Sequence, residues 1–121
     1  MMQGSVVNLH ALLHIRFRLT DGSYRDVEFV IDTGFTGFLT LPPQEVAALG
    51  LPFAYHTRAY LADHSEVRLP VHEGTILWSA EELSINVLAT GERPLLGTAL
   101  LKGHELMVQF AENGLVTVDI L

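Results

Sequence analysis

The feature that most constrains this chain is one aspartate, Asp32, between two apolar segments, residues 29–31 and 38–41. Segments of this kind form buried strands, and a carboxylate beside them is costly to remove from water. Such a group needs a partner, a set of hydrogen bonds or a shifted pKa. Thr33 and Gly34 follow directly, and they supply a hydroxyl and a backbone that can turn its N–H groups toward the carboxylate.

The tripeptide Asp32-Thr33-Gly34 has two interpretations when it is taken alone, because it is also a good turn sequence. One interpretation is a plain hairpin turn, and the other is a catalytic loop. The apolar segments on both sides favour the catalytic loop. They place Asp32 at a junction between strand and loop, where active-site groups are often found because the rigid strand fixes them in space.

A second motif lies toward the C-terminus, where Leu95-Leu96-Gly97 precedes a short helical segment. Glycine at this place permits a close approach of the backbone beside the Asp32 loop. The two motifs, in this order, resemble the retroviral-type (retropepsin-like) single-domain aspartic proteases, of the bacterial or archaeal type. The resemblance covers residues 6–121. It implies a single domain over residues 1–121 with a mostly all-β fold, a closed antiparallel β-barrel with two short helices.

Hydrophobic alternation and turn signals agree with a chain that is nearly all β, with about seven or eight strands. Besides the segment at 38–41, strands are expected at residues 6–19, 24–31, 53–61, 67–78, 83–88, 104–110 and 115–121. Helices are expected at 42–50, which has proline early and glycine at its end, and at 98–102, with Thr98 as the N-cap.

Composition excludes several classes of protein. The chain has 121 residues, of which 49% are hydrophobic and 17% charged, as expected for one globular domain and not for a disordered chain. A net charge of −7 without a basic cluster argues against nucleic acid as a partner. No apolar run approaches the roughly 18 residues of a membrane span. There is no cysteine and no pattern of a signal peptide, so we expect a cytoplasmic protein without a membrane partner.

Sequence motifs of other catalytic chemistries are absent. The six histidines are scattered without the spacing of metal ligands, so no metal site is expected. Neither a Gly-x-Ser-x-Gly motif nor a glycine-rich phosphate loop is present. No cofactor is implied, because water is the nucleophile in hydrolysis by carboxylates.

Peptide hydrolysis by aspartates requires two carboxylates that share a proton, one acting as base and the other as acid. This chain has a single Asp-Thr-Gly. The remaining aspartates lack the small-residue turn and the apolar flanks, and these are Asp21, Asp26, Asp63 and Asp119. The chemistry therefore requires a homodimer, in which Asp32 of each subunit lies at the two-fold axis.

The resemblance also implies roles for individual residues. Asp32 would be the catalytic acid or base, Thr33 would bond across the dimer axis, and Gly34 would let a backbone amide face the carboxylates. The cleft and a flap over the substrate would include Val30, Leu61, Ala62 and Asp63. The local sequence at 62–66 also fits an exposed polar turn. In the resembled family the chain ends interleave, so the strand at 115–121 is expected to help join the subunits.

We therefore expect an aspartic endopeptidase that cleaves a peptide or protein substrate. The family usually has a small residue after Asp-Thr-Gly, whereas this chain has Phe35, and Thr98 and Ala99 stand where the viral enzymes have Arg and Asn. The alternative is a dimeric β-barrel that binds a peptide or a partner protein without hydrolysing it.

Overall fold

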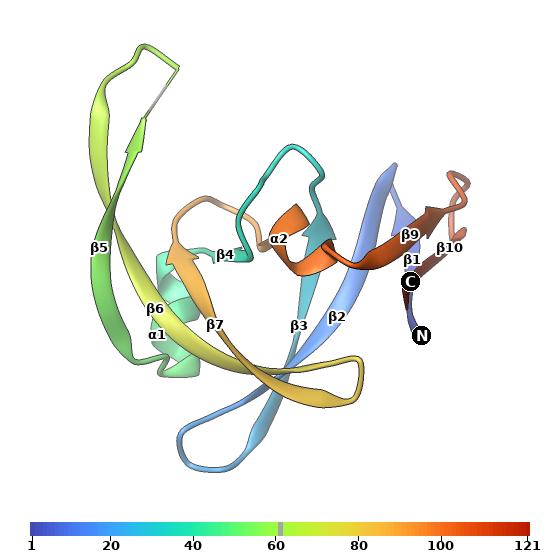
Figure 1. Ribbon diagram of the computed structural model, residues 1–121, viewed down its shortest axis with the longest axis horizontal. Helices are drawn as coiled ribbons and strands as arrows, with labels where there is room; N and C mark the ends of the chain where they lie inside the picture. Colours follow the sequence, from blue (N-terminus) through green and yellow to red (C-terminus); the bar gives the residue numbers. More distant parts are fainter. Residues whose placement is uncertain (61) are drawn as a thin grey trace.

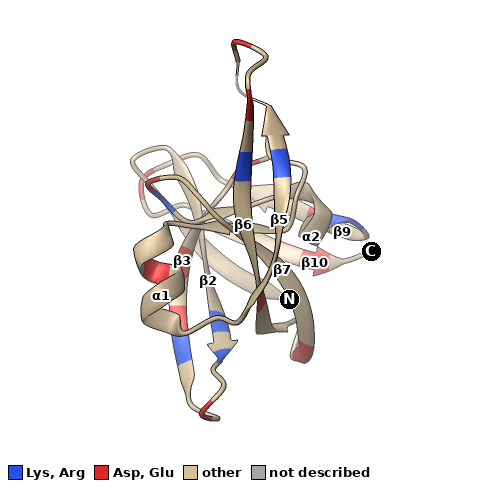
Figure 2. Cartoon of the chain, turned by 90° about the vertical axis from the view of Figure 1, so that its left-hand side faces the viewer, with Lys and Arg blue, Asp and Glu red and all other residues tan. Residues whose placement is uncertain are grey.

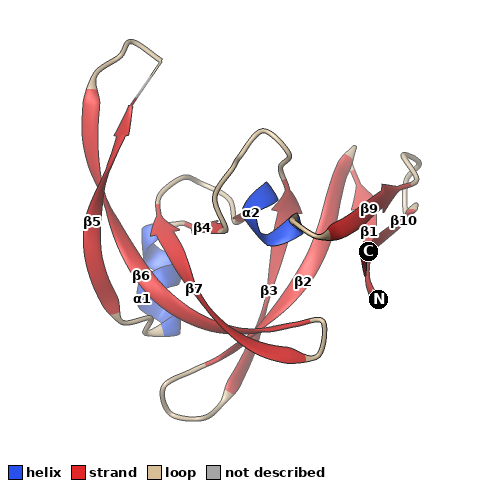
Figure 3. Cartoon of the chain, viewed as in Figure 1, coloured by secondary structure: helices blue, strands red, loops and turns tan. Residues whose placement is uncertain are grey.

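The computed structural model describes residues 1–60 and 62–121, which form mostly strands with two short helices (Figures 1 and 3). The strands are β1 (Met2–Val7), β2 (His10–Arg18), β3 (Tyr24–Ile31), β4 (Leu39–Leu41), β5 (Phe53–Tyr60), β6 (Glu66–Trp78), β7 (Glu81–Ala89), β8 (Leu95–Leu96), β9 (His104–Val108) and β10 (Leu115–Ile120). The helices are α1 (Pro43–Leu49) and α2 (Thr98–Leu101). The predicted mostly-β class with two short helices is confirmed.

All these strands belong to one sheet, in the order β5-β6-β7-β4-β8-β3-β2-β1-β10-β9. An additional pairing of β2 with β6 brings the sheet back on itself, so the strands from β6 to β2 in this order form a ring. The strand pairs are antiparallel except for β3 with β8 and β4 with β7, which are parallel. The ring encloses the core and carries the loop of Asp32 at one end.

The core follows from the alternation of the strands. In β2 the side chains of Ile15 and Phe17 are buried, whereas those of Arg16 and Arg18 are exposed, as the sequence pattern predicts. The ring of Phe17 stacks on that of Phe29 in β3, with centroids 6.1 Å apart. Large buried aromatic side chains contribute much of the apolar area that stabilises such a domain.

Helix α1 confirms the prediction for residues 42–50. It begins at Pro43, where the missing N–H would have no partner within the helix, and its C-cap Gly50 has φ 64°. Helix α2 corrects a detail of the prediction. Its N-cap is Gly97 and not Thr98, and the Thr98 hydroxyl instead donates to the carbonyl oxygen of Phe35 at 3.3 Å.

The strand predicted at residues 6–19 is wrong in its extent. The chain turns at Asn8 and Leu9, whose φ values are 49° and 67°, and this turn separates β1 from β2. Strand β1 begins at Met2, earlier than the expected start at residue 6. Two consecutive residues in the left-handed conformation form a tight hairpin turn whose twist matches that of the flanking strands. The usual sequence of such a turn is Asn-Gly, whereas this chain has Asn-Leu. The structure thus has β1 as a separate strand. It also has a further strand that was not expected, β8, which has only two residues.

The final strand, β10, lies between β1 and β9 of its own chain. We expected residues 115–121 to be an exposed strand that pairs with another subunit. Both edges of β10 are instead occupied within the chain, because Gly4 pairs with Val116 and Val108 pairs with Val116 from the other side. The open edge at this end of the sheet belongs to β9.

Candidate active site

The two sequence motifs meet at the centre of the sheet, because β8 lies between β3 and β4. Strand β3 ends at Ile31, the chain passes through the loop of Asp32, and β4 returns on the far side of β8. Val30 pairs in parallel with Leu95, and Leu39 pairs in the antiparallel sense with Leu96. Two segments that are far apart in the sequence are thus adjacent (Figure 1).

Backbone hydrogen bonds join the Asp32 loop to β8 and α2 along its length. The donor and acceptor pairs are Asp32 N to Leu96 O (2.9 Å), Gly97 N to Phe38 O (2.8 Å), Thr98 N to Phe35 O (2.8 Å) and Ala99 N to Gly37 O (3.1 Å). A loop whose polar backbone groups are satisfied in this way has few alternative conformations. The position of Asp32 is therefore set by the fold and not by the loop alone.

The Asp32 carboxylate is half-buried, and its Oδ1 accepts a hydrogen bond of 2.9 Å from the backbone N–H of Gly34. The sequence predicted this contact from the small-residue turn. Thr33 is exposed, and among the described residues its hydroxyl has no hydrogen-bond partner. The carboxylate keeps its second oxygen free of hydrogen bonds to these residues.

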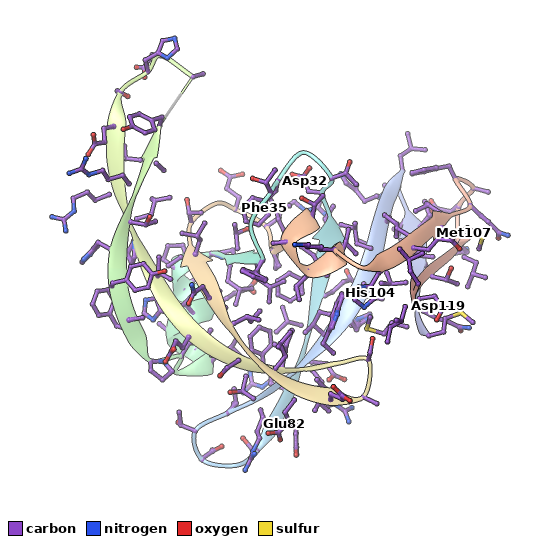
Figure 4. The ribbon with its side chains drawn as sticks, in the orientation of Figure 1. Asp32, Phe35, Glu82, His104, Met107 and Asp119 are labelled. Atoms are coloured by element: carbon purple, nitrogen blue, oxygen red, sulfur yellow. The ribbon has the colours of Figure 1, made fainter. Side chains whose placement is uncertain are left out.

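The ring of Phe35 is half-buried and packs against two glycines. A Cβ built on Gly37 would lie 2.6 Å from Phe35 Cζ, and one built on Gly97 would lie 2.5 Å from Phe35 Cδ2. Figure 4 shows Asp32 and Phe35 together on the β3–β4 loop, at the opposite end of the molecule from Glu82. The aromatic ring therefore fills the space between the loop and the start of α2.

A pocket of about 360 Å³ opens beside Asp32. Its lining combines residues of both motifs with the first residue of β2 and the segment before β8. It comprises His10, Val30, Ile31, Asp32, Thr33, Arg93 and Leu95. Of the residues assigned to the site from the sequence, Val30 and Thr33 thus lie with Asp32. Four residues of the lining were not assigned to the site from the sequence, namely His10, Ile31, Arg93 and Leu95. Arg93 and Leu95 are at or next to the second motif and could have been found from it, whereas His10 is brought there by a turn that the sequence did not indicate.

The hairpin of β5 and β6 projects beyond the rest of the molecule (Figures 1 and 2). Its base faces the Asp32 loop, because Tyr55 lines a pocket of about 190 Å³ together with Gly37 and Phe38. The hydroxyl of Tyr55 accepts a hydrogen bond of 3.0 Å from Asn86 Nδ2. The hairpin at this position was predicted, and its strands agree with the prediction.

Of the predicted flap residues at the tip, the two that the structure describes, Ala62 and Asp63, do not line the Asp32 pocket. Leu61 lies outside the described residues. Ala62 is exposed, and Asp63 Oδ1 accepts hydrogen bonds from the hydroxyl and the backbone N–H of Ser65 at 2.6 and 2.9 Å. These hydrogen bonds, that of the hydroxyl first, lower the pKa of the Asp63 carboxyl below its ordinary value. Asp63 thus stabilises the turn.

Among the described residues, no group of three or more His, Asp or Glu side chains is placed to hold a metal ion. No helix in the described part of the chain is long and apolar enough to cross a membrane.

Comparisons with known proteins support a fold and not a sequence family. No protein-family model and no curated protein matches the sequence. Among solved structures, the chain is similar to a retropepsin-like aspartic protease from Rickettsia conorii, with a TM-score of 0.63 over 98% of this chain and 89% of that one. The fold is retropepsin-like. Identity between the two sequences is 14%, so the likeness concerns the fold alone.

Proposed function

We propose that this protein is an aspartic endopeptidase in which Asp32 of two subunits forms the catalytic pair. The observation that carries the proposal is the placement of Asp32 at the end of β3, with its Oδ1 on the Gly34 amide, in a retropepsin-like fold. The loop is held against β8 by the hydrogen bond from Asp32 N to Leu96 O. A carboxylate held by a rigid scaffold in this way suits general acid–base chemistry.

A second carboxylate has to come from another copy of the chain. Asp32 is the only acidic residue among those that line its pocket in the described part of the chain. Two-fold symmetry would bring two Asp32 side chains together, and two adjacent carboxylates cannot both ionise readily. The pair then holds one proton between them. The exposed hydroxyl of Thr33 is available for a hydrogen bond across the same axis.

Hydrolysis would proceed by attack of water on the scissile carbonyl carbon. The ionised carboxylate takes a proton from the water as the new C–O bond forms, and the protonated carboxyl gives its proton to the carbonyl oxygen. The tetrahedral intermediate breaks when the C–N bond is cleaved. The carboxyl group that took the proton from water gives it to the amine nitrogen, and the other carboxylate takes a proton from a hydroxyl group of the intermediate as the product carboxyl group forms. Each turnover thus returns the pair to its starting state with one proton.

The termini offer a surface for the second subunit. In the described part of the chain, strand β9 is an edge strand of the sheet. Large apolar side chains are exposed on and next to the terminal strands, namely Met107, Ile120 and Leu121. Figure 4 shows Met107 and Asp119 on this part of the molecule. An open strand edge with apolar neighbours tends to pair with another chain.

The direct test replaces Asp32 by Asn and measures cleavage of unfolded casein and of a peptide library. Asn is nearly isosteric but cannot share the proton, so activity should fall by several orders of magnitude, on the order of 10²–10⁴-fold or more. Asp21→Asn is the matched control, because Asp21 Oδ1 also accepts a backbone hydrogen bond of 2.9 Å from the residue two positions later. Activity of Asp32→Asn equal to that of Asp21→Asn would overturn the proposed role.

The alternative is a dimer that binds a peptide or partner protein without cleaving it. The observation in its favour is Phe35, whose ring occupies the space next to the Asp32 loop where the resembled family usually has a small side chain. Pepstatin separates the two functions. An endopeptidase of this type is inhibited by it, whereas a binding protein shows no cleavage in its presence or its absence.

A further inference from the structure

The pocket beside Asp32 has an unusual distribution of charge. Its lining includes the apolar residues Val30, Ile31 and Leu95, and beside them Arg93 and His10. The whole chain has a net charge of −7 and only 7 lysine and arginine residues, yet one of these lies in the same pocket as the proposed catalytic carboxylate. A cation in this place acts on whatever part of a ligand lies next to Asp32.

The exposed Arg93 side chain lies next to a histidine and not next to a carboxylate. Its Nη1 lies 3.4 Å from His10 Nε2, and no carboxylate of the described residues lies within 4.0 Å of its guanidinium. Since a guanidinium only donates hydrogen bonds, the ring nitrogen of His10 is the acceptor. This contact leaves the charge of Arg93 uncompensated.

Three of the other arginines have a different environment. Arg16, Arg18 and Arg58 form ion pairs with Asp26, Glu82 and Glu66 at 2.8, 2.9 and 3.3 Å. Their charge is compensated within the protein. The donors of Arg93 that face the pocket are available to a ligand, and a carboxylate is the group that matches a guanidinium best in charge and geometry.

We infer that Arg93 makes this pocket selective for an acidic side chain, so that the preferred peptide carries Glu or Asp next to the bond that lies at Asp32. The cleavage part of this inference rests on the proposed function, whereas the binding part does not. The pocket volume of about 360 Å³ is sufficient for such a side chain. The apolar residues of the lining would contact its methylene groups while the carboxylate reaches Arg93.

The test compares peptides that differ only in having Glu, Gln or Lys at the residue on either side of the cleaved bond. For wild-type protein, kcat/KM should be about tenfold higher with Glu than with Gln, which is the size expected of a hydrogen bond to a charged group at a partly exposed site. Arg93→Gln should abolish the preference, Arg93→Lys should retain part of it, and Arg93→Glu should favour Lys.

Arg25→Gln is the matched control. Arg25 lies at the other end of β3, is exposed, and has no carboxylate within 4.0 Å among the described residues, so its loss should leave the Glu preference unchanged.

A pH series distinguishes recognition of the peptide carboxylate by Arg93 from a purely structural role of Arg93. The ratio of kcat/KM with Glu to kcat/KM with Gln should fall to about one below about pH 4, because the peptide carboxylate takes up a proton there. The ratio is the quantity to compare, since titration of the Asp32 pair affects both peptides alike.

Binding of fluorescent, uncleaved peptides to Asp32→Asn separates this inference from the proposed function. Cleavage that depends on Asp32 but does not distinguish Glu from Gln, or does so equally well in Arg93→Gln, would overturn the inference and leave the protease proposal standing. Absence of cleavage with Arg93-dependent binding of Glu peptides would support a pocket selective for acidic side chains and would contradict hydrolysis. Absence of both would overturn both.

Discussion

The ring of Phe35 lies so close to the backbone of Gly97 that no side chain fits between them. A Cβ on Gly97 would lie 2.5 Å from Phe35 Cδ2 and 2.2 Å from the carbonyl oxygen of Gly37. The carbonyl oxygen of Phe35 also accepts a hydrogen bond of 2.8 Å from the Thr98 N–H. Phe35 thus connects the loop of Asp32 to the second motif by packing and by its backbone.

We predict that Gly97→Ala destabilises the protein by about 2 kcal/mol or more, because a new carbon in a filled space forces backbone or ring to move. The φ of Gly97 is −100°, so the cost arises from crowding and not from backbone conformation. Gly103→Ala is the control, because a Cβ there meets open space and only its φ of 80° opposes the change. Urea denaturation measures both. A loss for Gly97→Ala no larger than for Gly103→Ala would contradict the packing argument.

Removal of the ring itself should affect turnover more than peptide binding. Phe35→Ala leaves a space between the loop and α2, so Asp32 is held less well in the position that the chemistry requires. We expect kcat to fall about tenfold or more with a smaller change in KM, and stability to fall by about 1–3 kcal/mol for a half-buried aromatic side chain. Steady-state kinetics beside urea denaturation gives the comparison. A rise in KM at unchanged kcat would assign Phe35 to substrate binding instead.

The tips of two hairpins offer a matched pair of substitutions. Asp21-Gly22-Ser23 and Asp63-His64-Ser65 form the same hydrogen-bonded turn, with central φ values of 85° and 66°. His64→Gly should stabilise the protein by about 0.5 kcal/mol, since glycine adopts this conformation without the steric cost of a Cβ. Gly22→His should destabilise it by about 1 kcal/mol for the same reason. Changes of the same sign in both variants would contradict this view of the turns.

The ion pair between Arg16 and Asp26 makes a prediction about acid. Hydrogen bonds from Arg16 to the carboxylate, at 2.8 and 3.3 Å, lower the pKa of Asp26 below 3.8. A lowered pKa in the folded state stabilises the protein above the unfolded value, and this contribution is lost as pH falls through the folded value. Asp26→Asn should therefore be less stable than wild type at neutral pH, and the difference should shrink below pH 3.8. The pair is exposed, so the effect is small.

Urea denaturation at a series of pH values measures this difference between the two proteins. Arg16→Gln should give the same pH dependence as Asp26→Asn, because either change removes the interaction. A difference between wild type and Asp26→Asn that stays constant from neutral to acid pH would show that the ion pair does not contribute.

The sequence predicted the elements whose signals are local. The strand ending at Ile31, the helix between Pro43 and Gly50 and the hairpin of β5 and β6 all follow from hydrophobic alternation and from proline and glycine at turns. The contact of Gly34 with Asp32 was predicted from the small residues of the loop. These features are determined by neighbours along the chain.

Features that depend on distant residues were not predicted. Nothing local indicates that β10 lies between β1 and β9, or that Leu95-Leu96 forms a strand between β3 and β4. The turn at Asn8 and Leu9 was missed because left-handed conformations are expected at glycine, and it is this turn that brings His10 to Arg93. The composition of the pocket beside Asp32 is therefore a property of the fold.

The measurement that tests the account most directly is activity in mixtures of wild-type protein and Asp32→Asn at constant total concentration. If each active site needs Asp32 from two subunits, then an equal mixture that has exchanged subunits should retain about a quarter of the wild-type activity, since only dimers with two wild-type subunits are active. Sedimentation should show a dimer at the same concentration. Retention of half the activity, or full activity of a monomer, would contradict the shared catalytic pair.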